Sequence, residues 1–109
     1  MVKIGKIDWT KFNGKYVRLA TGVEKRLQLT NWTDGEWFGK PGLSFDVIQE
    51  DGETVQKQFT VTSQMLIRLL RPILEKAERQ DKNIIKVSIL RTGEKRNTRY
   101  SVNELPSEL

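Results

Sequence analysis

The chain has 109 residues, of which 37% are hydrophobic, 30% are charged and 8% are aromatic, and its net charge is +5. This length suits one domain with one hydrophobic core and is too short for two. Cysteine and histidine are both absent, which excludes disulfides and thiolate chemistry and removes the commonest general base and metal ligand, so we expect no enzyme, cofactor or metal site.

The N-terminal segment contains several lysines but lacks the apolar stretch of a secretory signal, and no apolar run in the chain is long enough to cross a bilayer. The expected location is the cytoplasm, without a membrane partner. Residues 1–13 are expected to pack against the domain as a clasp through Trp9 and Phe12. The alternative for this segment is an additional basic arm.

An alternation of apolar and polar residues between 14 and 30 indicates strand structure. In its second half, Leu27 and Leu29 point one way while Arg26 points the other. Gly22 divides the alternation into two pieces. It can serve either as a bend within one long strand or as a plain hairpin turn.

Glycine, proline and aspartate interrupt the alternation between Asn31 and Gly42, which is typical of an irregular loop. Aromatic rings stack on unpaired bases, at about 1–3 kcal/mol per base, and cations follow the phosphates of a single strand. Trp32 is predicted in phase with Arg26 on the polar side of the strand. The alternative for any one aromatic residue here is a plug over an open end of the core. Residues 31–42 supply aromatic rings for base stacking and a cation for phosphate contact: Trp32, Trp37, Phe38 and Lys40.

A second strand is predicted from Leu43 to about Gln49, followed by a hairpin turn at Asp51-Gly52 and a third strand over residues 54–62. Phe45 and Phe59 have the parity of core residues. Nearby acidic residues are interpreted as a solvated turn and not as a metal site. The polar side chains of the third strand can hydrogen-bond bases or sugars: Gln56, Gln58 and Thr60.

The period changes after Thr62, because the apolar residues between Leu66 and Ala77 fall on one stripe of an amphipathic helix. Thr62 or Ser63 can cap its N-terminus. Pro72 interrupts the pattern, since proline inside a helix removes a backbone hydrogen bond and costs roughly 3 kcal/mol. We therefore expect a helix with a bend near residues 68–72.

A closing hairpin is predicted from the β-branched run Ile84–Leu90 and from the alternation of Thr98, Tyr100 and Val102. Tyr100 has the parity of a core residue, with a role in binding as the alternative. The turn between the two strands is basic, which suits either contact with phosphates or simple solvation. Four cations lie in or beside it: Arg91, Lys95, Arg96 and Arg99.

The order of these elements is strand, strand, strand, helix, strand, strand. A five-stranded Greek-key barrel of the OB type has this order, and it binds oligonucleotides through strands two and three and the loops joining strands one to two and four to five. We therefore predict a mainly β fold, a single domain of this kind with a short flexible tail at residues 104–109. An open α+β sheet capped by one helix is the alternative. In the barrel, the aromatic segment and the basic turn are expected side by side on one rim.

With these elements placed, residues 14–103 resemble the compact OB-fold single-stranded DNA-binding proteins of archaea and phages. The resemblance lies in Leu27–Trp32, in Phe59–Ser63 before the helix and in Gly93–Val102. It implies binding of single-stranded DNA without sequence preference and protection of exposed strands in replication, repair or recombination. Bacterial members carry a long tail with an acidic, partner-recruiting tip, which residues 103–109 do not match.

Single-stranded DNA is thus the expected ligand. RNA held by the same groove is one alternative, and a protein-interaction module that docks a partner through its aromatic loop is another. The predicted binding surface draws on four segments: Arg26, Trp32, Trp37, Phe38, Lys40, Gln56, Gln58, Arg91, Lys95, Arg96, Arg99 and Tyr100.

Overall fold

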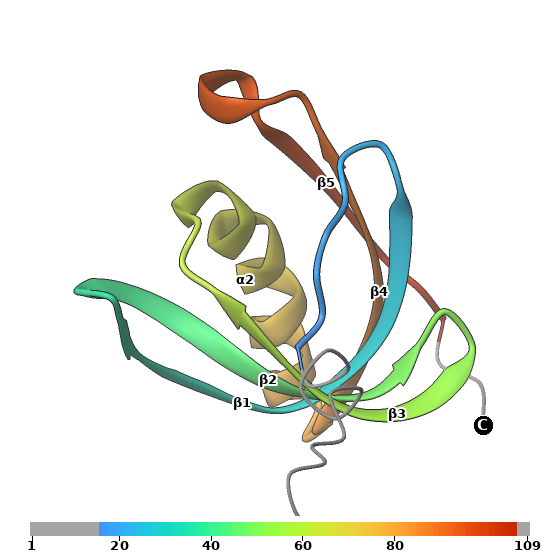
Figure 1. The fold of residues 1–109 in the computed structure, drawn as a ribbon. Helices are drawn as coiled ribbons and strands as arrows, with labels where there is room; N and C mark the ends of the chain where they lie inside the picture. The colour runs from blue at the N-terminus through green and yellow to red at the C-terminus, as the bar shows by residue number, and fades with distance from the viewer. Residues whose placement is uncertain (1–15, 107–109) are drawn as a thin grey trace, which may run out of the picture.

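A computed structural model of the chain describes residues 16–106 (Figure 1). This part of the chain forms five antiparallel strands in one sheet, with one long helix between the third and fourth strands. It contains no helix with the length and apolar character needed to span a bilayer. The predicted clasp at residues 1–13 and the last three residues of the predicted tail lie outside the described residues.

The sheet has the strand order β3-β2-β1-β4-β5, so the first strand lies in the middle. The chain crosses through the helix after β3 and returns on the other side of β1, where β4 pairs with it. The mainly β fold with a helix between strands three and four is confirmed. β3 and β5 are the two edges of the sheet. The elements are β1 Glu24–Trp37, β2 Lys40–Glu50, β3 Glu53–Val61, α2 Gln64–Arg79, β4 Ile84–Thr92, the 3-10 turn η1 Lys95–Asn97 and β5 Arg99–Glu104.

A turn at Gly22 separates β1 from the segment before it. Gly22 has a φ of +80°, and the N–H of Val23 donates to the carbonyl of Ala20 at 3.2 Å. A turn therefore forms at Gly22, but it is not the hairpin turn of the sequence alternative, because the segment before it bridges β3 and β4 and not β1. Before the turn, residues 16–21 make one bridge to β3 and one to β4: Tyr16 with Gln58, and Thr21 with Arg91.

The hydrophobic core lies between the inner face of the curved sheet and α2, which the sheet partly surrounds (Figure 1). Residues spaced by two in the strands and by three or four in the helix meet there, as their periodicity predicts. The rings of Phe45 and Phe59 stack with their centroids 6.0 Å apart, which confirms both as core residues. The most completely buried side chains come from three strands and the helix: Leu27, Leu29, Phe45, Val47, Leu70, Val87 and Ile89.

The prediction of an irregular loop over residues 31–42 is wrong, because this segment is the outer part of a long hairpin. β1 continues to Trp37 and β2 begins at Lys40, and only Phe38 and Gly39 lie between them. Both turn residues have positive φ, +54° and +75°. Two-residue turns of this kind match the twist of the flanking strands. Gly35, Pro41 and Gly42 therefore lie in paired strands, and Gly39 lies in the turn, so the segment is not irregular.

The helix begins at the predicted cap, since the Ser63 hydroxyl accepts a hydrogen bond from the N–H of Leu66 at 3.3 Å. From there α2 runs to Arg79 with Pro72 inside it. Its buried stripe confirms the amphipathic pattern: Leu66, Leu70, Leu74 and Ala77. At the other end of the chain, β5 continues through Glu104, and the N–H of Leu105 donates to the carbonyl of Lys86 at 2.7 Å. The first residues of the predicted tail are thus attached to the sheet.

Candidate nucleic-acid interface

A bulge in β1 decides where the first aromatic residue of the hairpin points. Thr30 pairs with Asp46 and Thr33 with Ser44, so β1 carries one residue more than β2 at this point. Asn31 occupies the bulge with a φ of +52°. One extra residue reverses the alternation of side chains between the two faces of a strand.

Trp32 consequently faces α2 and not the polar side of the sheet, which corrects the predicted parity. The indole is partly buried against the core, and its Nε1 lies 3.4 Å from Oε2 of Glu78 in α2. It borders a pocket of about 470 Å³ between the hairpin and the helix. The plug alternative thus describes Trp32 better than a role as an open stacking platform.

Trp37 lies flat over the backbone of its own hairpin. Gly35 and Gly42 are paired across the strands, and a Cβ atom added to Gly35 would come within 2.9 Å of Cη2 of Trp37. At Gly42 the added Cβ atom would lie 3.3 Å from Cε3 of the same ring. Gly35 therefore makes room for the indole, which is partly buried. At Gly42 the nearest atom to the added Cβ would be the backbone carbonyl oxygen of Val61, at 2.5 Å, so this glycine mainly permits the close approach of β3.

Phe38 differs from both tryptophans, because its side chain is 99% exposed at the tip of the hairpin. The next most exposed large hydrophobic side chain in the described part of the chain, Val23, is 52% exposed. Phe38 also has the positive φ of the turn. Among the aromatic groups of residues 16–106, this ring is therefore the most accessible to a ligand.

The predicted cations of the two hairpin tips are exposed. Lys40 follows the turn at Phe38, and the other three lie in η1 and at the start of β5. Arg26 is also exposed, on the outer face of β1, where its Nε lies 3.6 Å from the Glu24 carboxylate. Within residues 16–106 four of these cations form no ion pair: Lys40, Lys95, Arg96 and Arg99.

Gln56 and Gln58 are exposed on β3, as their parity predicts. Gln58 is paired with Asp46 across β2 and β3. Its carbonyl also accepts a hydrogen bond from the N–H of Val17 at 2.9 Å. Their amide side chains belong to the polar outer face of the sheet.

Arg91 and Tyr100 are direct cross-strand partners in β4 and β5. Both are partly buried, and Tyr100 packs against the core, as its parity predicts. Arg91 Nη1 lies 3.4 Å from the carbonyl oxygen of Leu19. These two residues are thus set back from the exposed cations of the turn.

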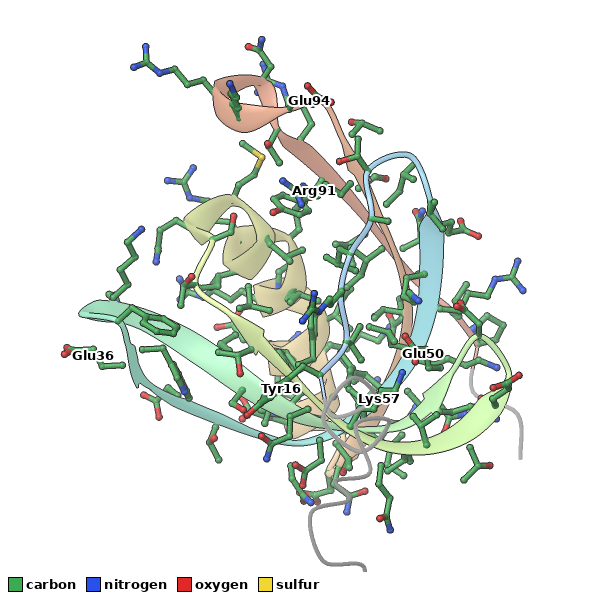
Figure 2. The ribbon with its side chains drawn as sticks, viewed as in Figure 1. Tyr16, Glu36, Glu50, Lys57, Arg91 and Glu94 are labelled. Carbon is green, nitrogen blue, oxygen red and sulfur yellow. The ribbon has the colours of Figure 1, made fainter. Side chains whose placement is uncertain are left out.

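The hairpin of β1 and β2 and the turn between β4 and β5 form two separate arms (Figure 1). In Figure 2, Glu36 marks the first arm and Glu94 the second, and the N-terminal end of α2 lies between them in this view. The sequence predicted two segments side by side on one rim. The structure instead shows them standing apart.

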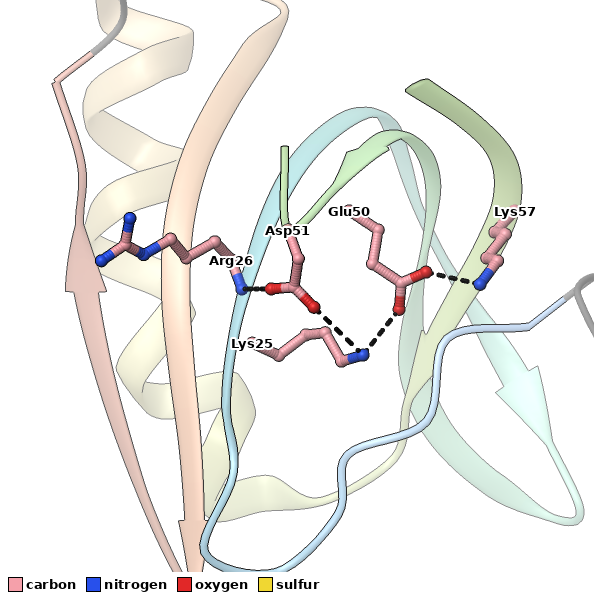
Figure 3. Close-up of polar contacts among 5 residues, drawn as sticks. All are labelled: Lys25, Arg26, Glu50, Asp51 and Lys57. Carbon is pink, nitrogen blue, oxygen red and sulfur yellow. Dashed lines mark hydrogen bonds and ion pairs between the residues drawn. The ribbon is translucent and has the colours of Figure 1, made fainter. Parts of the chain in front are cut away.

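A cluster of charges that the sequence analysis did not identify joins the first three strands (Figure 3). The carboxylate of Glu50 accepts hydrogen bonds from Lys57 and from Lys25, whose Nζ lies 2.9 Å from Oε2. Lys25 also lies 3.4 Å from the Asp51 carboxylate. Only the cross-strand register brings these residues together, so no local pattern could have revealed them.

Hydrogen bonds within this cluster favour the charged forms of Glu50 and Lys25. Burial by itself would raise the pKa of Glu50, but the hydrogen bonds from Lys57 and Lys25 outweigh it, and the pKa is lowered. The pKa of Lys25 is raised, mainly by its hydrogen bond to Glu50. Because these charges satisfy one another, the cluster holds strands together and leaves little capacity for a ligand. The described residues contain no group of three side chains suited to a metal ion.

Comparison of the chain with models of protein families, with curated proteins and with solved structures finds no match. The functional residues are therefore interpreted from their own positions and charges. Three features stand out on this basis: the exposed phenyl ring of Phe38, the unpaired cations of the two arms, and the recessed pair of Arg91 and Tyr100.

Proposed function

We propose that this protein binds single-stranded nucleic acid without sequence preference, with single-stranded DNA as its ligand. Bases stack on Phe38 at the tip of one arm, while the exposed cations of both arms contact the phosphates. The amides of Gln56 and Gln58 are available to bases or sugars on the outer face of the sheet. Such binding would protect exposed strands during replication, repair or recombination.

Phe38 is the observation that carries the proposal. Its backbone has the left-handed conformation, which costs an ordinary residue roughly 1–2 kcal/mol. Asparagine or glycine would suit the turn better. The side chain is 99% exposed, so it makes no packing contacts that would offset this cost. A residue that lowers stability without a structural gain is typical of a functional position, and an exposed ring suits base stacking.

The unpaired cations support the same ligand. Lys40 lies on the first arm, and Lys95, Arg96 and Arg99 lie on the second. Cations without carboxylate partners are available to neutralise phosphates, and each neutralised phosphate releases counterions. An extended strand that spans both arms would contact the two groups together.

We propose further that the sheet is a partly open barrel of the OB type. The spatial order β4-β1-β2-β3 is that of a Greek key. β5 lies beside β4, and the helix lies between β3 and β4. In the OB fold, the connections between strands one and two and between strands four and five contact oligonucleotides. Those connections correspond to the two arms.

The test is a titration of fluorescein-labelled oligothymidine followed by fluorescence anisotropy. Wild-type protein is expected to give saturable binding that weakens with salt, with a log–log slope of about −0.7 per phosphate contacted. Phe38→Asn is expected to weaken binding about tenfold through loss of one stacked base. Ile84→Thr is the matched control, because Ile84 is also exposed but pairs with Thr30, roughly 25 Å along β1 from the hairpin tip.

Absence of binding at low salt, or binding that salt does not weaken, would overturn the proposal. Equal losses in Phe38→Asn and Ile84→Thr would remove Phe38 from the site. Competition between oligothymidine and oligouridine decides between DNA and RNA, because a preference for RNA requires contacts to the 2′-hydroxyl. A stable protein assembly that Phe38→Asn disrupts, without nucleic-acid affinity, would instead indicate a protein-docking module.

A further inference from the structure

A small pocket opens at the end of the core where β3, the start of α2 and the hairpin of β4 and β5 meet. Its volume is about 240 Å³. The described residues that line it include one cation, Arg91, and no carboxylate. The remaining lining is apolar apart from four hydroxyl side chains: Thr60, Thr62, Ser63 and Tyr100. The pocket is therefore positively charged and rich in hydrogen-bonding groups.

Arg91 is incompletely satisfied in this position. The guanidinium group has five N–H donors, and within residues 16–106 its one hydrogen bond is the 3.4 Å contact from Nη1 to the carbonyl of Leu19. Its Nε is buried and has no hydrogen-bond partner among these residues. A partly buried cation without a counter-charge is unfavourable. An anion in the pocket would supply the missing partner.

The fold holds Arg91 at this point through strand parity. Ile85, Val87 and Ile89 are buried on the inner face of β4, and Arg91 continues the same alternation at the end of the stripe. Tyr100 lies directly across from it in β5. Figure 2 shows Arg91 near the start of α2 and close to the turn that Glu94 marks.

The start of α2 borders the pocket from the other side through Ser63 and Leu66. The hydroxyl of Ser63, which accepts a hydrogen bond from the N–H of Leu66, can also donate a hydrogen bond into the pocket. The helix dipole adds partial positive charge at this end. Together with the guanidinium group, the hydroxyl donors of the lining suit a tetrahedral, multiply charged oxyanion better than a neutral base.

We propose that this pocket binds a phosphate group of the nucleic-acid strand, with Arg91 as its principal ligand and Tyr100 against the adjoining sugar or base. The assignment rests on the proposed function, which it makes more specific. The phosphate can be an internal phosphodiester of a strand that spans the two arms, or a terminal phosphate. The pocket presents the same chemistry to both.

The experiment compares wild-type protein with Arg91→Met, which keeps an apolar stem and removes the charge. Oligothymidine with a 5′-hydroxyl and the same oligomer with a 5′-phosphate are titrated across a series of salt concentrations. Arg91→Met is expected to bind about tenfold more weakly at low salt, and the magnitude of its log–log slope falls by about 0.7, the value for one phosphate contact. Arg79→Met is the control, because Arg79 is an exposed cation at the far end of α2.

Equal losses with both oligomers identify an internal phosphate, and a loss confined to the 5′-phosphorylated oligomer identifies a terminal one. Unchanged affinity and slope with both would overturn the assignment while the proposed function stands. If wild-type protein binds neither oligomer, the proposed function fails. Thermal unfolding with and without inorganic phosphate then tests whether the pocket binds an anion. If phosphate raises the thermal midpoint of wild-type protein but not that of Arg91→Met, the pocket still binds an anion. If phosphate does not raise the midpoint of wild-type protein, the anion site is excluded.

Arg91→Met is not expected to lower the thermal midpoint in the absence of phosphate, because the cation that it removes has no carboxylate partner among residues 16–106. This measurement separates a lost ligand contact from misfolding. If Arg91→Met does not fold, Arg91→Lys serves in its place. Lysine keeps the charge but not the planar fork of donors, so the assignment requires Arg91→Lys to bind more weakly than wild-type protein.

Discussion

The side-chain amide of Asn31 donates a hydrogen bond to the carboxylate of Asp46 at 2.9 Å, at the point where β1 carries its extra residue. The bond spans the bulge and holds a residue whose φ is +52°. Asparagine tolerates this conformation better than most residues do. The orientation of Trp32 toward α2 follows from this arrangement.

Replacing Asn31 with alanine is expected to lower the free energy of unfolding by about 1–2 kcal/mol, because alanine is disfavoured in the left-handed conformation. Asn31→Gly loses the same hydrogen bond but keeps the conformation at no steric cost. Urea denaturation followed by tryptophan fluorescence measures both variants. Equal stability of the alanine and glycine variants would show that the backbone conformation at residue 31 carries no cost.

Phe38→Asn is expected to raise the free energy of unfolding by about 1 kcal/mol, because asparagine is favoured in a two-residue hairpin turn with positive φ. Phe38→Ala is not expected to give this gain, since alanine has no preference for the turn. Thermal and urea unfolding of the three proteins provide the measurement. A loss of stability in Phe38→Asn would mean that the phenyl ring supports the fold, and would weaken its assignment to ligand binding.

Stability at low pH is expected to depend on Glu50, whose side chain is 11% exposed. Its pKa in the folded protein is lowered from the ordinary value of 4.5. The stabilisation is therefore complete above that value and is lost as the pH falls through the lowered pKa. Glu50→Gln should lower stability near neutral pH by about 1–3 kcal/mol and reduce the loss on acidification.

Chemical denaturation between pH 2 and pH 7 tests this expectation, with Glu53→Gln as the exposed control. Identical acid dependence in wild-type protein and Glu50→Gln would contradict it. On the alkaline side, the pKa of Lys25 is raised from 10.5. Its contribution is present below that value and is lost as the pH rises through the raised pKa, so Lys25→Met should be less sensitive to alkaline pH than wild-type protein.

Pro72→Ala is expected to stabilise the protein by about 1–3 kcal/mol. Proline is roughly 3 kcal/mol less favourable than alanine inside a helix, and its restriction of the unfolded chain offsets about 0.4–1 kcal/mol of this difference. Pro72 is exposed, so the substitution leaves no cavity. Calorimetry gives the change directly, and an unchanged or lowered thermal midpoint would show that the packing of α2 depends on the proline.

Local patterns in the sequence were sufficient for several features of the fold. The stripe from Leu66 to Ala77 and the cap at Ser63 predicted α2, because helical spacing and capping involve only neighbouring residues. The Asp51-Gly52 turn forms with positive φ at both residues. The parity of Phe45 and Phe59 placed both rings in the core.

The arrangement of the two hairpins was predicted less well, because it depends on how strands pair. The glycines and the proline of residues 35–42 indicated a loop, yet a two-residue turn at Phe38 continues the pairing to the tip of the hairpin. The bulge at Asn31 reverses the side on which Trp32 lies. The aromatic and basic character of the two arms can be recognised from the residue types, but their separation cannot.

The sequence by itself determined the order of the elements, the residues that form the core and the basic and aromatic character of the two hairpins, because each depends on spacing along the chain. Only the tertiary structure decided which aromatic ring is exposed and which guanidinium group is partly buried. The Phe38 side chain projects into solvent, whereas Arg91 is partly buried and its Nε atom is fully buried. The physical reason is that register, bulges and the approach of distant strands arise from contacts between residues far apart in sequence, which no local pattern records.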